Sequence, residues 1–523
     1  MMASLLLSRV LGLVRESIIS GKFGADGLTS AYFQSFKIPD LLFFLIAGGA
    51  LSSAFIPVFS EYLHTERERE AWHIFSVVTT FMSILVIAFI VVAWIFAVPL
   101  SQLIFPGTKP DMIVYVAQMS RIVLPAQFAF FIGGIMFGTL YANQRFSVPG
   151  LGPNIYNVGI IFGALVISAF VTPSVSGMSW GALTGAFLGN ILIPLLALRT
   201  IGVQFKPSLD LKHPGVKKVF KLMLPVVLGL SLPGVYSLIM DSFGSFYAPA
   251  VISYLDYSNK LMQAPLGIFG QSLAIAVFPA LTQFYAQKRM DMYREQLSKT
   301  MRTVLYLTVP ISVLMFVMAP QVVGTMLEHG KFDAADRAAT ANCLRMFAIG
   351  IPAWCLHPVL MRGFFAIQNT VTPIVLGTLT TGLFIALIFA LRVLDIGYLA
   401  LPLAGSISAM LLVISLAFAV APKIGGLDVK GLGITALKAL VGTLGIGLLA
   451  GMVAYTEIAD RIAGQKVPTI LAAGGVFLIG GWIYYFITKW FGMPESQYVA
   501  RAMNRRAKRS EPVTPIESDG GPE

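Results

Sequence analysis

The chain has 523 residues, of which 56% are hydrophobic and only 12% are charged, and its mean hydropathy is +0.79. A soluble protein of this size carries about twice that fraction of charged residues. The composition therefore excludes a soluble globular protein and indicates an integral membrane protein. Its apolar runs have the length of membrane-spanning helices and do not alternate as strands do, which favours a helix bundle over a barrel.

About fourteen apolar segments are expected to cross the membrane as helices, each with ends defined to within a few residues. They lie at about 2–20, 29–62, 73–100, 112–142, 151–171, 177–198, 217–247, 250–283, 297–327, 335–367, 372–393, 397–421, 433–454 and 467–492. Arginines interrupt the first segment and no small-residue cleavage site follows it, so we expect no cleaved signal peptide.

Basic residues are distributed unevenly between the two sides of the membrane. If the N-terminus is cytoplasmic, the even-numbered connections carry most lysines and arginines, including Arg67, Arg145 and Lys288, whereas the opposite side holds few, such as Lys109 and Lys331. This asymmetry follows the positive-inside rule and predicts that both termini are cytoplasmic. It also explains the net charge of +12 by topology, without nucleic-acid binding.

The chain repeats internally. The stretch from Ser30 aligns without a gap with the stretch from Ile252. Two later pairs of segments match in the same order: those around Pro99 and Pro320, and then those that end at Pro149 and Pro373. Matched residues in the first pair are Tyr32 with Tyr254, Gly48 with Gly270, Leu51 with Leu273 and Pro57 with Pro279. Each unit holds six helices, an even number, so the copies share one orientation and are related by an axis along the membrane normal.

The predicted architecture is therefore two six-helix lobes, residues 1–213 and 214–428, followed by two helices in 429–493. Residues 494–523 form a basic, then Pro/Ser/Gly-rich segment, which we expect to be a disordered cytoplasmic tail near anionic lipid. Two parallel lobes are typical of an alternating-access carrier. No catalytic constellation, metal-ligand pattern or phosphate loop is visible, so we expect neither an enzyme nor a cofactor beyond a coupled monovalent cation or the membrane potential.

Charges inside the first apolar segments are candidates for a substrate site, because each costs roughly 3 kcal/mol at membrane depth unless it faces water or a partner. Arg9 and Arg15 lie six residues apart, about 120° around a helix. Arg9 either anchors the cytoplasmic end of its helix or borders a cavity, whereas Arg15, followed by Glu16, lies deeper and favours a cavity. A guanidinium suits phosphate, which indicates a phosphate-bearing or pyrophosphate-bearing substrate.

Further candidates occur in both repeats. Lys37 precedes Pro39, which interrupts the helix, and the corresponding region of the second lobe holds Lys260. Lys260 either binds substrate or is neutralised by Asp256, four residues earlier. Asp241 is an isolated carboxylate within an apolar segment, and it either binds a cation or proton or pairs with an arginine of a neighbouring helix.

Four stretches together resemble the MurJ/MviN lipid II flippases of the multidrug/oligosaccharidyl-lipid/polysaccharide exporter superfamily. They are SRVLGLVRESIISGKFGA, FKIPDLLFFLIAGGALSSAFIPVFSEY, LEHGKFDAADRAATANCLRMFAIGIP and RGFFAIQNTVTP. The resemblance covers nearly the whole chain. It implies fourteen helices around a V-shaped central cavity, and transport of undecaprenyl-pyrophosphate-linked disaccharide-pentapeptide to the outer face of the bacterial cytoplasmic membrane, alongside the cell-wall synthesis machinery.

The resemblance also implies roles for individual residues. The family's cavity arginines on helix 1 fall at Arg9 and Arg15, its following acid at Glu16, and its helix 8 arginine at Lys260, which keeps the charge without the planar fork. Asp241 matches a helix 7 carboxylate that some members link to cation binding. The family pattern is not kept at six positions, namely Phe43, Phe44, Gly48, Gln263, Phe384 and Ile388.

The last two predicted helices, which are rich in glycine and apolar residues, are candidates for a groove that holds the lipid tail of such a substrate. Three other functions remain open. A drug/cation antiporter of the same superfamily should favour carboxylates in its cavity, and a polysaccharide-lipid flippase differs only in family motifs. A non-transporting scaffold of the cell-wall machinery is favoured by the loss of the helix 2 arginine and acid.

Overall fold

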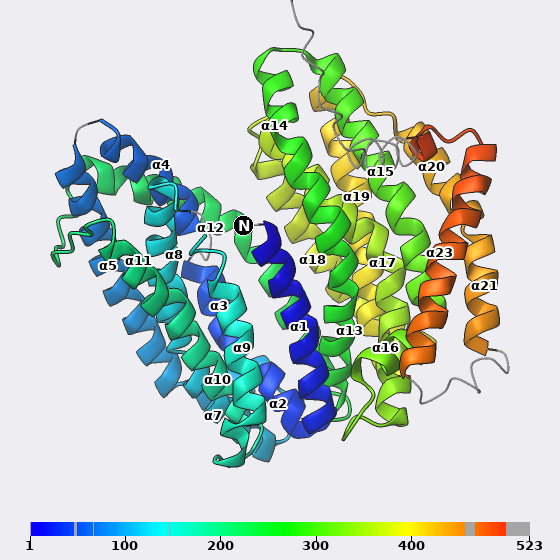
Figure 1. Ribbon diagram of the computed structural model, residues 1–523, viewed down its shortest axis with the longest axis horizontal. Coiled ribbons are helices and arrows are strands. Elements are labelled where there is room, and N and C mark those ends of the chain that lie inside the picture. The colour runs from blue at the N-terminus through cyan, green and yellow to red at the C-terminus, as the bar shows by residue number, and fades with distance from the viewer. Residues whose placement is uncertain (1, 47–49, 66, 146, 456–465, 498–523) are drawn as a thin grey trace, which may run out of the picture.

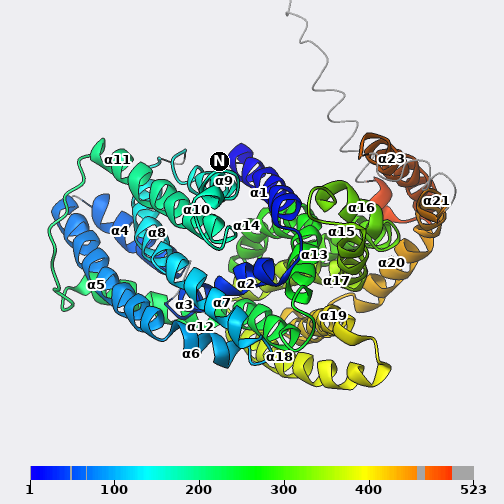
Figure 2. The same cartoon turned by 90° about the horizontal axis from the view of Figure 1, so that it is seen from below.

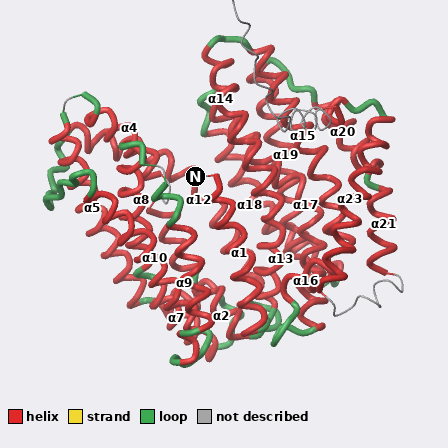
Figure 3. The backbone as a smooth tube through the Cα atoms, viewed as in Figure 1, coloured by secondary structure: helices red, strands yellow, loops and turns green. Residues whose placement is uncertain are grey.

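The computed structural model describes residues 2–46, 50–65, 67–145, 147–455 and 466–497, and every regular element in this part of the chain is a helix. The helices form two groups that diverge toward the end where the N-terminus lies (Figure 1), and loops connect them at both ends (Figure 3). The all-helical membrane fold predicted from composition and segment length is confirmed.

The first group consists of eleven helices among the described residues. They are α1 (Met2–Phe23), α2 (Gly27–Ser35), α3 (Lys37–Ile46), α4 (Ala50–Leu63), α5 (Glu68–Ile95), α6 (Ala97–Ile104), α7 (Pro110–Val123), α8 (Ala126–Ala142), α9 (Gly152–Leu165), α10 (Ser176–Phe187) and α11 (Ile193–Arg199). A 3₁₀ turn at Ile167–Ala169 follows α9, and a π-helical turn at Leu188–Leu192 joins α10 to α11.

The second group begins with the long helix α12 and continues to the end of the described chain. Its helices are α12 (Pro214–Gly244), α13 (Val251–Pro265), α14 (Ser272–Ala286), α15 (Met290–Val317), α16 (Ala319–Leu327), α17 (Ala334–Ala366), α18 (Val371–Leu391), α19 (Ala400–Val420), α20 (Val429–Gly442), α21 (Leu444–Tyr455) and α23 (Lys466–Trp490). A π-helical turn at Leu266–Gln271 joins α13 to α14, and 3₁₀ turns occupy Arg392–Leu394, Gly397–Leu399 and Ala421–Ile424.

Eleven helical segments of the described chain are long and apolar enough to cross a membrane. The three predicted segments not among them are 2–20, 29–62 and 217–247. The first carries several charges, and the second is divided into α2, α3 and α4. The third lies almost entirely within the single continuous helix α12. The count of fourteen crossings stays a prediction.

Matched positions of the repeat alignment share a helix-ending turn. Gln144 and Gln368 occupy matched positions of the aligned segments, and both adopt left-handed conformations, with φ of 59° and 57°. In each case the next amide bonds the carbonyl five residues before it, from Arg145 to Leu140 (2.8 Å) and from Asn369 to Phe364 (2.9 Å). Lys288 ends α14 with the same turn, so this backbone feature agrees with the internal repeat, which stays a prediction.

The two groups meet at the end opposite the N-terminus, where α2 lies beside α13 and α1 beside α16 (Figure 1). The hydroxyl of Ser30 bonds that of Ser253 at 2.8 Å, and these two residues lie one position apart in the repeat alignment. The Lys331 amide donates to the Gly21 carbonyl at 2.8 Å. Gly330, with φ of +59°, makes this approach possible, because a side chain there would collide with the Gly21 backbone.

Helix α12 packs against both groups. Near its start, Val216 and Val219 are fully buried in the core of the first group, and Lys218 pairs with Glu61 of α4 at 2.6 Å. Toward its end the helix contacts α18 and α19. The division at residue 213 follows the internal repeat, whereas the packing makes α12 a link between the two lobes. The Gly48 position and most of the tail, residues 498–523, lie outside the described residues.

Candidate substrate site between the two lobes

Helix α1 lies between the lobes and is held against α9 by two asparagines. Asn154 donates to the Ser4 hydroxyl at 2.7 Å, and Asn157 donates to the Ser8 carbonyl at 3.3 Å. Polar side chains at this spacing in an apolar helix commonly bond a neighbouring helix. The opposite side of α1 is open, since Arg9 is exposed and Val10 is 56% exposed.

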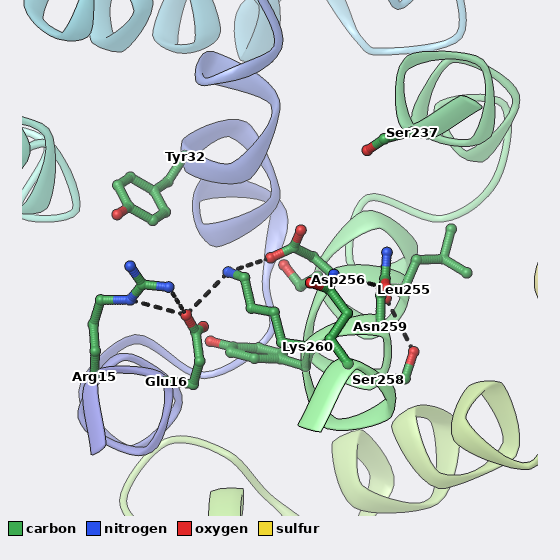
Figure 4. A network of polar contacts seen from close by, with 12 residues as sticks. Arg15, Glu16, Tyr32, Ser237, Leu255, Asp256, Ser258, Asn259 and Lys260 are labelled. Atoms are coloured by element: carbon green, nitrogen blue, oxygen red, sulfur yellow. Dashed lines mark hydrogen bonds and ion pairs between the residues drawn. The ribbon is translucent and has the colours of Figure 1, made fainter. Parts of the chain in front are cut away.

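Arg15 and Glu16 stand at the centre of the site (Figure 4). The Arg15 guanidinium donates to Glu16 Oε1 from Nε at 3.0 Å and from Nη2 at 2.5 Å, and its Nη1 donates to Asn157 Oδ1 at 3.0 Å. Glu16 is buried, and its Oε2 has no hydrogen-bond partner among the described residues. The negative charge of this buried carboxylate is therefore stabilised through one oxygen, Oε1, alone.

Lys260 reaches the same carboxylate from the second lobe. Its Nζ lies 3.1 Å from Glu16 Oε1 and 2.5 Å from Asp256 Oδ2, as Figure 4 shows. The ammonium also lies 4.2 Å from the centre of the Phe33 ring, a cation–π distance. The predicted pairing of Lys260 with Asp256 on its own helix is present, and the same ammonium also meets Glu16 beside Arg15 across the lobes. Substrate binding by Lys260 stays a prediction.

Lys37 and Asp241 form a second pair that the sequence left as separate candidates. Lys37 Nζ lies 2.8 Å from Asp241 Oδ2 and donates to the Ser237 hydroxyl at 2.7 Å. Both side chains are largely buried, at 11% and 7% exposed. Pro39 lies in the first turn of α3, where its missing amide proton is not required, and Lys37 is the first residue of that helix. Asp241 is thus paired with a neighbouring helix, through a lysine instead of an arginine.

Arg9 lies apart from this network. It makes no ion pair with a described acidic residue, and its guanidinium rests against Gly267, in the π-helical turn between α13 and α14. A side chain at position 267 would occupy the place of Arg9 Nη1. Arg9 therefore borders the second lobe while remaining exposed, in keeping with a position at the margin of the site.

Positions where the family pattern is not kept are apolar or uncharged here. The Phe43 ring packs 5.6 Å from that of Phe131, and Gln263 is exposed and donates to Asn259. On α18, Phe384 and Ile388 are buried, and the Phe384 ring lies 4.4 Å from that of Tyr236. Both side chains are apolar and cannot pair with Asp241, whose ionic partner is instead Lys37 of α3.

Two contributors were not found from sequence. Asn157 orients the Arg15 guanidinium, and Phe33 lies against Lys260. The asparagines at 154 and 157 give the one available signal, since two amides three residues apart in an apolar helix face a partner. Nothing in the sequence distinguishes Phe33 from the other aromatic residues of α2.

The charges around Glu16 balance. Arg15 and Lys260 supply two positive charges, and Glu16 and Asp256 supply two negative charges. Arg15 and Lys260 are both already paired with Glu16, so an entering dianion can bind these two cations only if it replaces the Glu16 carboxylate. The arrangement is therefore suited to exchange of one anion for another, and it connects the lobes as long as Glu16 holds both cations.

A helical membrane protein with two lobes and a charged site between them has the architecture of a membrane transporter. The profile of a family described as "Lipid II flippase MurJ" matches residues 19–462. The chain belongs to this family of lipid II flippases.

Similar proteins carry the same description. A "Probable lipid II flippase MurJ" of Buchnera aphidicola subsp. Acyrthosiphon pisum is 29% identical over 370 residues, 70% of this chain and 72% of the relative. A "Lipid II flippase MurJ" of Burkholderia cenocepacia is 28% identical over 378 residues, 71% of this chain and 72% of the relative.

Solved structures share the fold. A lipid II flippase MurJ in an inward closed conformation matches with a TM-score of 0.75 and 24% identity, covering 92% of this chain and 98% of that chain. An inward-facing multidrug resistance transporter of the MATE family matches with a TM-score of 0.66 and 13% identity, covering 82% and 96%. The two-lobed helical architecture is therefore common to lipid and drug transporters.

Proposed function

We propose that this protein moves lipid II, the undecaprenyl-pyrophosphate-linked disaccharide-pentapeptide, from the cytoplasmic to the outer leaflet by alternating access. The observation that carries the proposal is the meeting of Arg15 and Lys260, one from each lobe, at Glu16. A pyrophosphate offers the same kind of oxygen ligand with more negative charge. It replaces Glu16 between the two cations, and the lobes then close around it.

The proposal includes a location and a direction. We place the protein in the bacterial cytoplasmic membrane with both termini in the cytoplasm, because basic residues gather on the side of the N-terminus. Arg9 and Val10, on the N-terminal part of α1, are exposed, so we propose that the site is reached from the cytoplasm and that the flipped product leaves toward the cell-wall synthesis machinery. For Asp241 we propose a role in coupling, in which a cation or proton takes the place of Lys37 during the cycle.

Complementation tests the proposed substrate. A bacterial strain depleted of its own lipid II flippase should grow when it expresses this chain, and labelled lipid II should reach the outer leaflet. Insertion and abundance are measured in the same cells. A stable, inserted protein that fails to support growth would overturn the proposal, and subsequent assays of drug efflux, polysaccharide-lipid transport and lipid II binding would separate the three alternatives.

A groove on the second lobe suits the lipid tail of this substrate. It is lined by residues of α15, α21 and α23 and has a volume of about 620 Å³. Its walls are almost entirely apolar or aromatic, including Leu314, Ile446, Phe477 and Trp482. Figure 2 shows α21 and α23 at the edge of the second lobe, away from the first. We propose that residues 429–493 form a tail groove with α15, which keeps the polyprenyl chain out of the charged site.

Filling this groove should slow flipping. Gly481 lines it, and a Cβ at this position would meet no atom within 4 Å, so Gly481→Phe enters the groove without backbone strain. Each displaced methylene costs about 0.8 kcal/mol, so exclusion of three lowers substrate affinity roughly 50-fold. Binding of lipid II to the purified protein measures the effect.

Gly474 on the same helix provides the matched control. A Cβ there also meets nothing within 4 Å, but the residue does not line the groove, so Gly474→Phe should bind lipid II as the wild type does. Deletion of 433–492 should abolish flipping while the two lobes remain inserted. Retained flipping by the deletion variant would show that the tail is held elsewhere.

A further inference from the structure

A second cavity lies at the beginning of α15, at the end of the molecule toward which the two groups of helices diverge (Figure 1). Its lining is charged, whereas that of the groove is apolar. Its volume is about 500 Å³. Six charged side chains line it, three of each sign: Arg294, Lys299, Arg302, Glu295, Asp428 and Glu495. No site residue discussed above belongs to it.

The cavity and the groove follow one ridge of α15. Arg294, Ser298 and Arg302 line the cavity, and Tyr306, Pro310 and Leu314 continue at the same four-residue spacing along the groove. Residues four apart form a continuous ridge on a helix surface. From Arg302 to Leu314 the ridge spans about 18 Å, close to the thickness of one leaflet, since the hydrocarbon core measures about 30 Å.

Two buried polar atoms of residues that line the charged cavity have no partner in the part of the chain that the structure describes. Glu495 is only 3% exposed, and its Oε2 makes no hydrogen bond with a described residue. Arg302 pairs with Asp428 through Nη2, but its Nε is buried and makes no hydrogen bond with these residues either. An unsatisfied buried donor and an unsatisfied buried carboxylate oxygen are both unfavourable, and together they point to a ligand that offers an acceptor and a donor.

We propose that these two spaces together bind one phospholipid of the cytoplasmic leaflet, an aminophospholipid such as phosphatidylethanolamine. Arg302 Nε donates to the phosphate, Glu495 accepts from the ammonium group, and the acyl chains lie against Tyr306, Pro310 and Leu314. The equal number of positive and negative side chains matches a headgroup that carries both charges. A headgroup with only a phosphate leaves Glu495 without a partner.

The inference has a consequence that rests on the proposed function. If the groove holds the substrate's polyprenyl tail, a resident phospholipid must leave before the tail enters. Aminophospholipid then competes with lipid II for the groove, although the headgroups of the two lipids bind at different places.

Lipid retention tests the site without any measurement of flipping. The full chain is reconstituted in nanodiscs of equal phosphatidylethanolamine and phosphatidylglycerol, purified, and the retained lipids are counted by native mass spectrometry. We expect one retained phosphatidylethanolamine per chain, in at least fivefold excess over phosphatidylglycerol. Glu495→Gln, which keeps the size of the side chain, should remove this preference, and Leu314→Trp should reduce retention of either lipid.

Matched variants and competitors make the result decisive. Arg302→Gln should lose the bound lipid, whereas Arg337→Gln, which breaks an Arg–Glu pair 2.8 Å long outside the cavity, should keep it. Equal retention of both lipids, or unchanged preference in Glu495→Gln, would refute the proposal. Displacement of the lipid by millimolar inorganic phosphate would also refute it, because the cavity would then be a site for a soluble anion. If the protein retains phosphatidylethanolamine but does not flip lipid II, the proposed function is refuted and the phospholipid site is not.

Discussion

Arg15→Ala is expected to abolish complementation and to lower the rate of lipid II flipping at least about a hundredfold. The substitution leaves Lys260 alone with Glu16 and Asp256, so the site changes from neutral to net negative and repels pyrophosphate. It also leaves the buried Glu16 with one cation, and breaking a buried ion pair costs about 3–5 kcal/mol. Flipping in proteoliposomes, normalised to inserted protein, measures the loss.

A conservative substitution at Arg15 and the removal of an arginine outside the site test whether the loss comes from the charge and geometry of Arg15. Arg15→Lys keeps the charge but loses the fork that reaches both Glu16 and Asn157, so we expect intermediate activity. Arg67→Ala removes an arginine that is 52% exposed and pairs with Glu70, and it should flip normally. Growth of cells with a well-inserted Arg15→Ala variant at the wild-type rate would remove Arg15 from the site while leaving the proposed flipping intact.

Separate substitution of Lys37 and Asp241 should each reduce flipping at least tenfold, and the double variant should be more active than either single one. Lys37→Met leaves the Asp241 carboxylate buried without its cation, and Asp241→Asn leaves the ammonium without its anion. Replacing both removes the uncompensated charge. Flipping by the four proteins gives the coupling energy, which we expect to be about 2 kcal/mol.

The ion present during this assay separates two roles of the pair. If Asp241 takes up a cation during transport, sodium should partly restore the Lys37→Met variant, and choline should not. The exposed pair Lys218–Glu61, whose side chains are 50% and 52% exposed, serves as the control and should show coupling near zero. Additive losses at Lys37 and Asp241 would show that their contact does not contribute to transport.

The fold class could be predicted from the sequence, and most members of the candidate site could be selected from it, because both rest on local features. Helix length and hydropathy are properties of consecutive residues, and the repeat alignment places Gln144 and Gln368, which adopt the same backbone turn, at matched positions. Arg15, Glu16 and Lys260 could be selected because charges within apolar segments are costly and therefore few.

The partners of these charges could not be predicted in the same way. Lys37 and Asp241 are 204 residues apart, and Arg15 and Asn157 are 142 apart, so only the packing of the lobes brings them together. Periodicity shows which face of a helix is polar, but it does not show which other helix that face meets. Pro39 indicated an interruption in the second predicted segment, but the sequence did not show where its three helices, α2, α3 and α4, begin and end.

The contact between the lobes at the end opposite the N-terminus differs in kind from the charged site. Ser30 bonds Ser253, the Tyr257 hydroxyl bonds the Gly24 carbonyl, and the Lys331 amide bonds the Gly21 carbonyl. These bonds join neutral groups, whereas Arg15, Lys260 and Lys37 are held by ionic pairs. Ionic strength and transmembrane voltage act on charges. Because the central pairs are largely buried, salt screens them weakly, and transmembrane voltage should be the stronger influence on how readily they exchange. The neutral contacts at the end opposite the N-terminus should respond to neither.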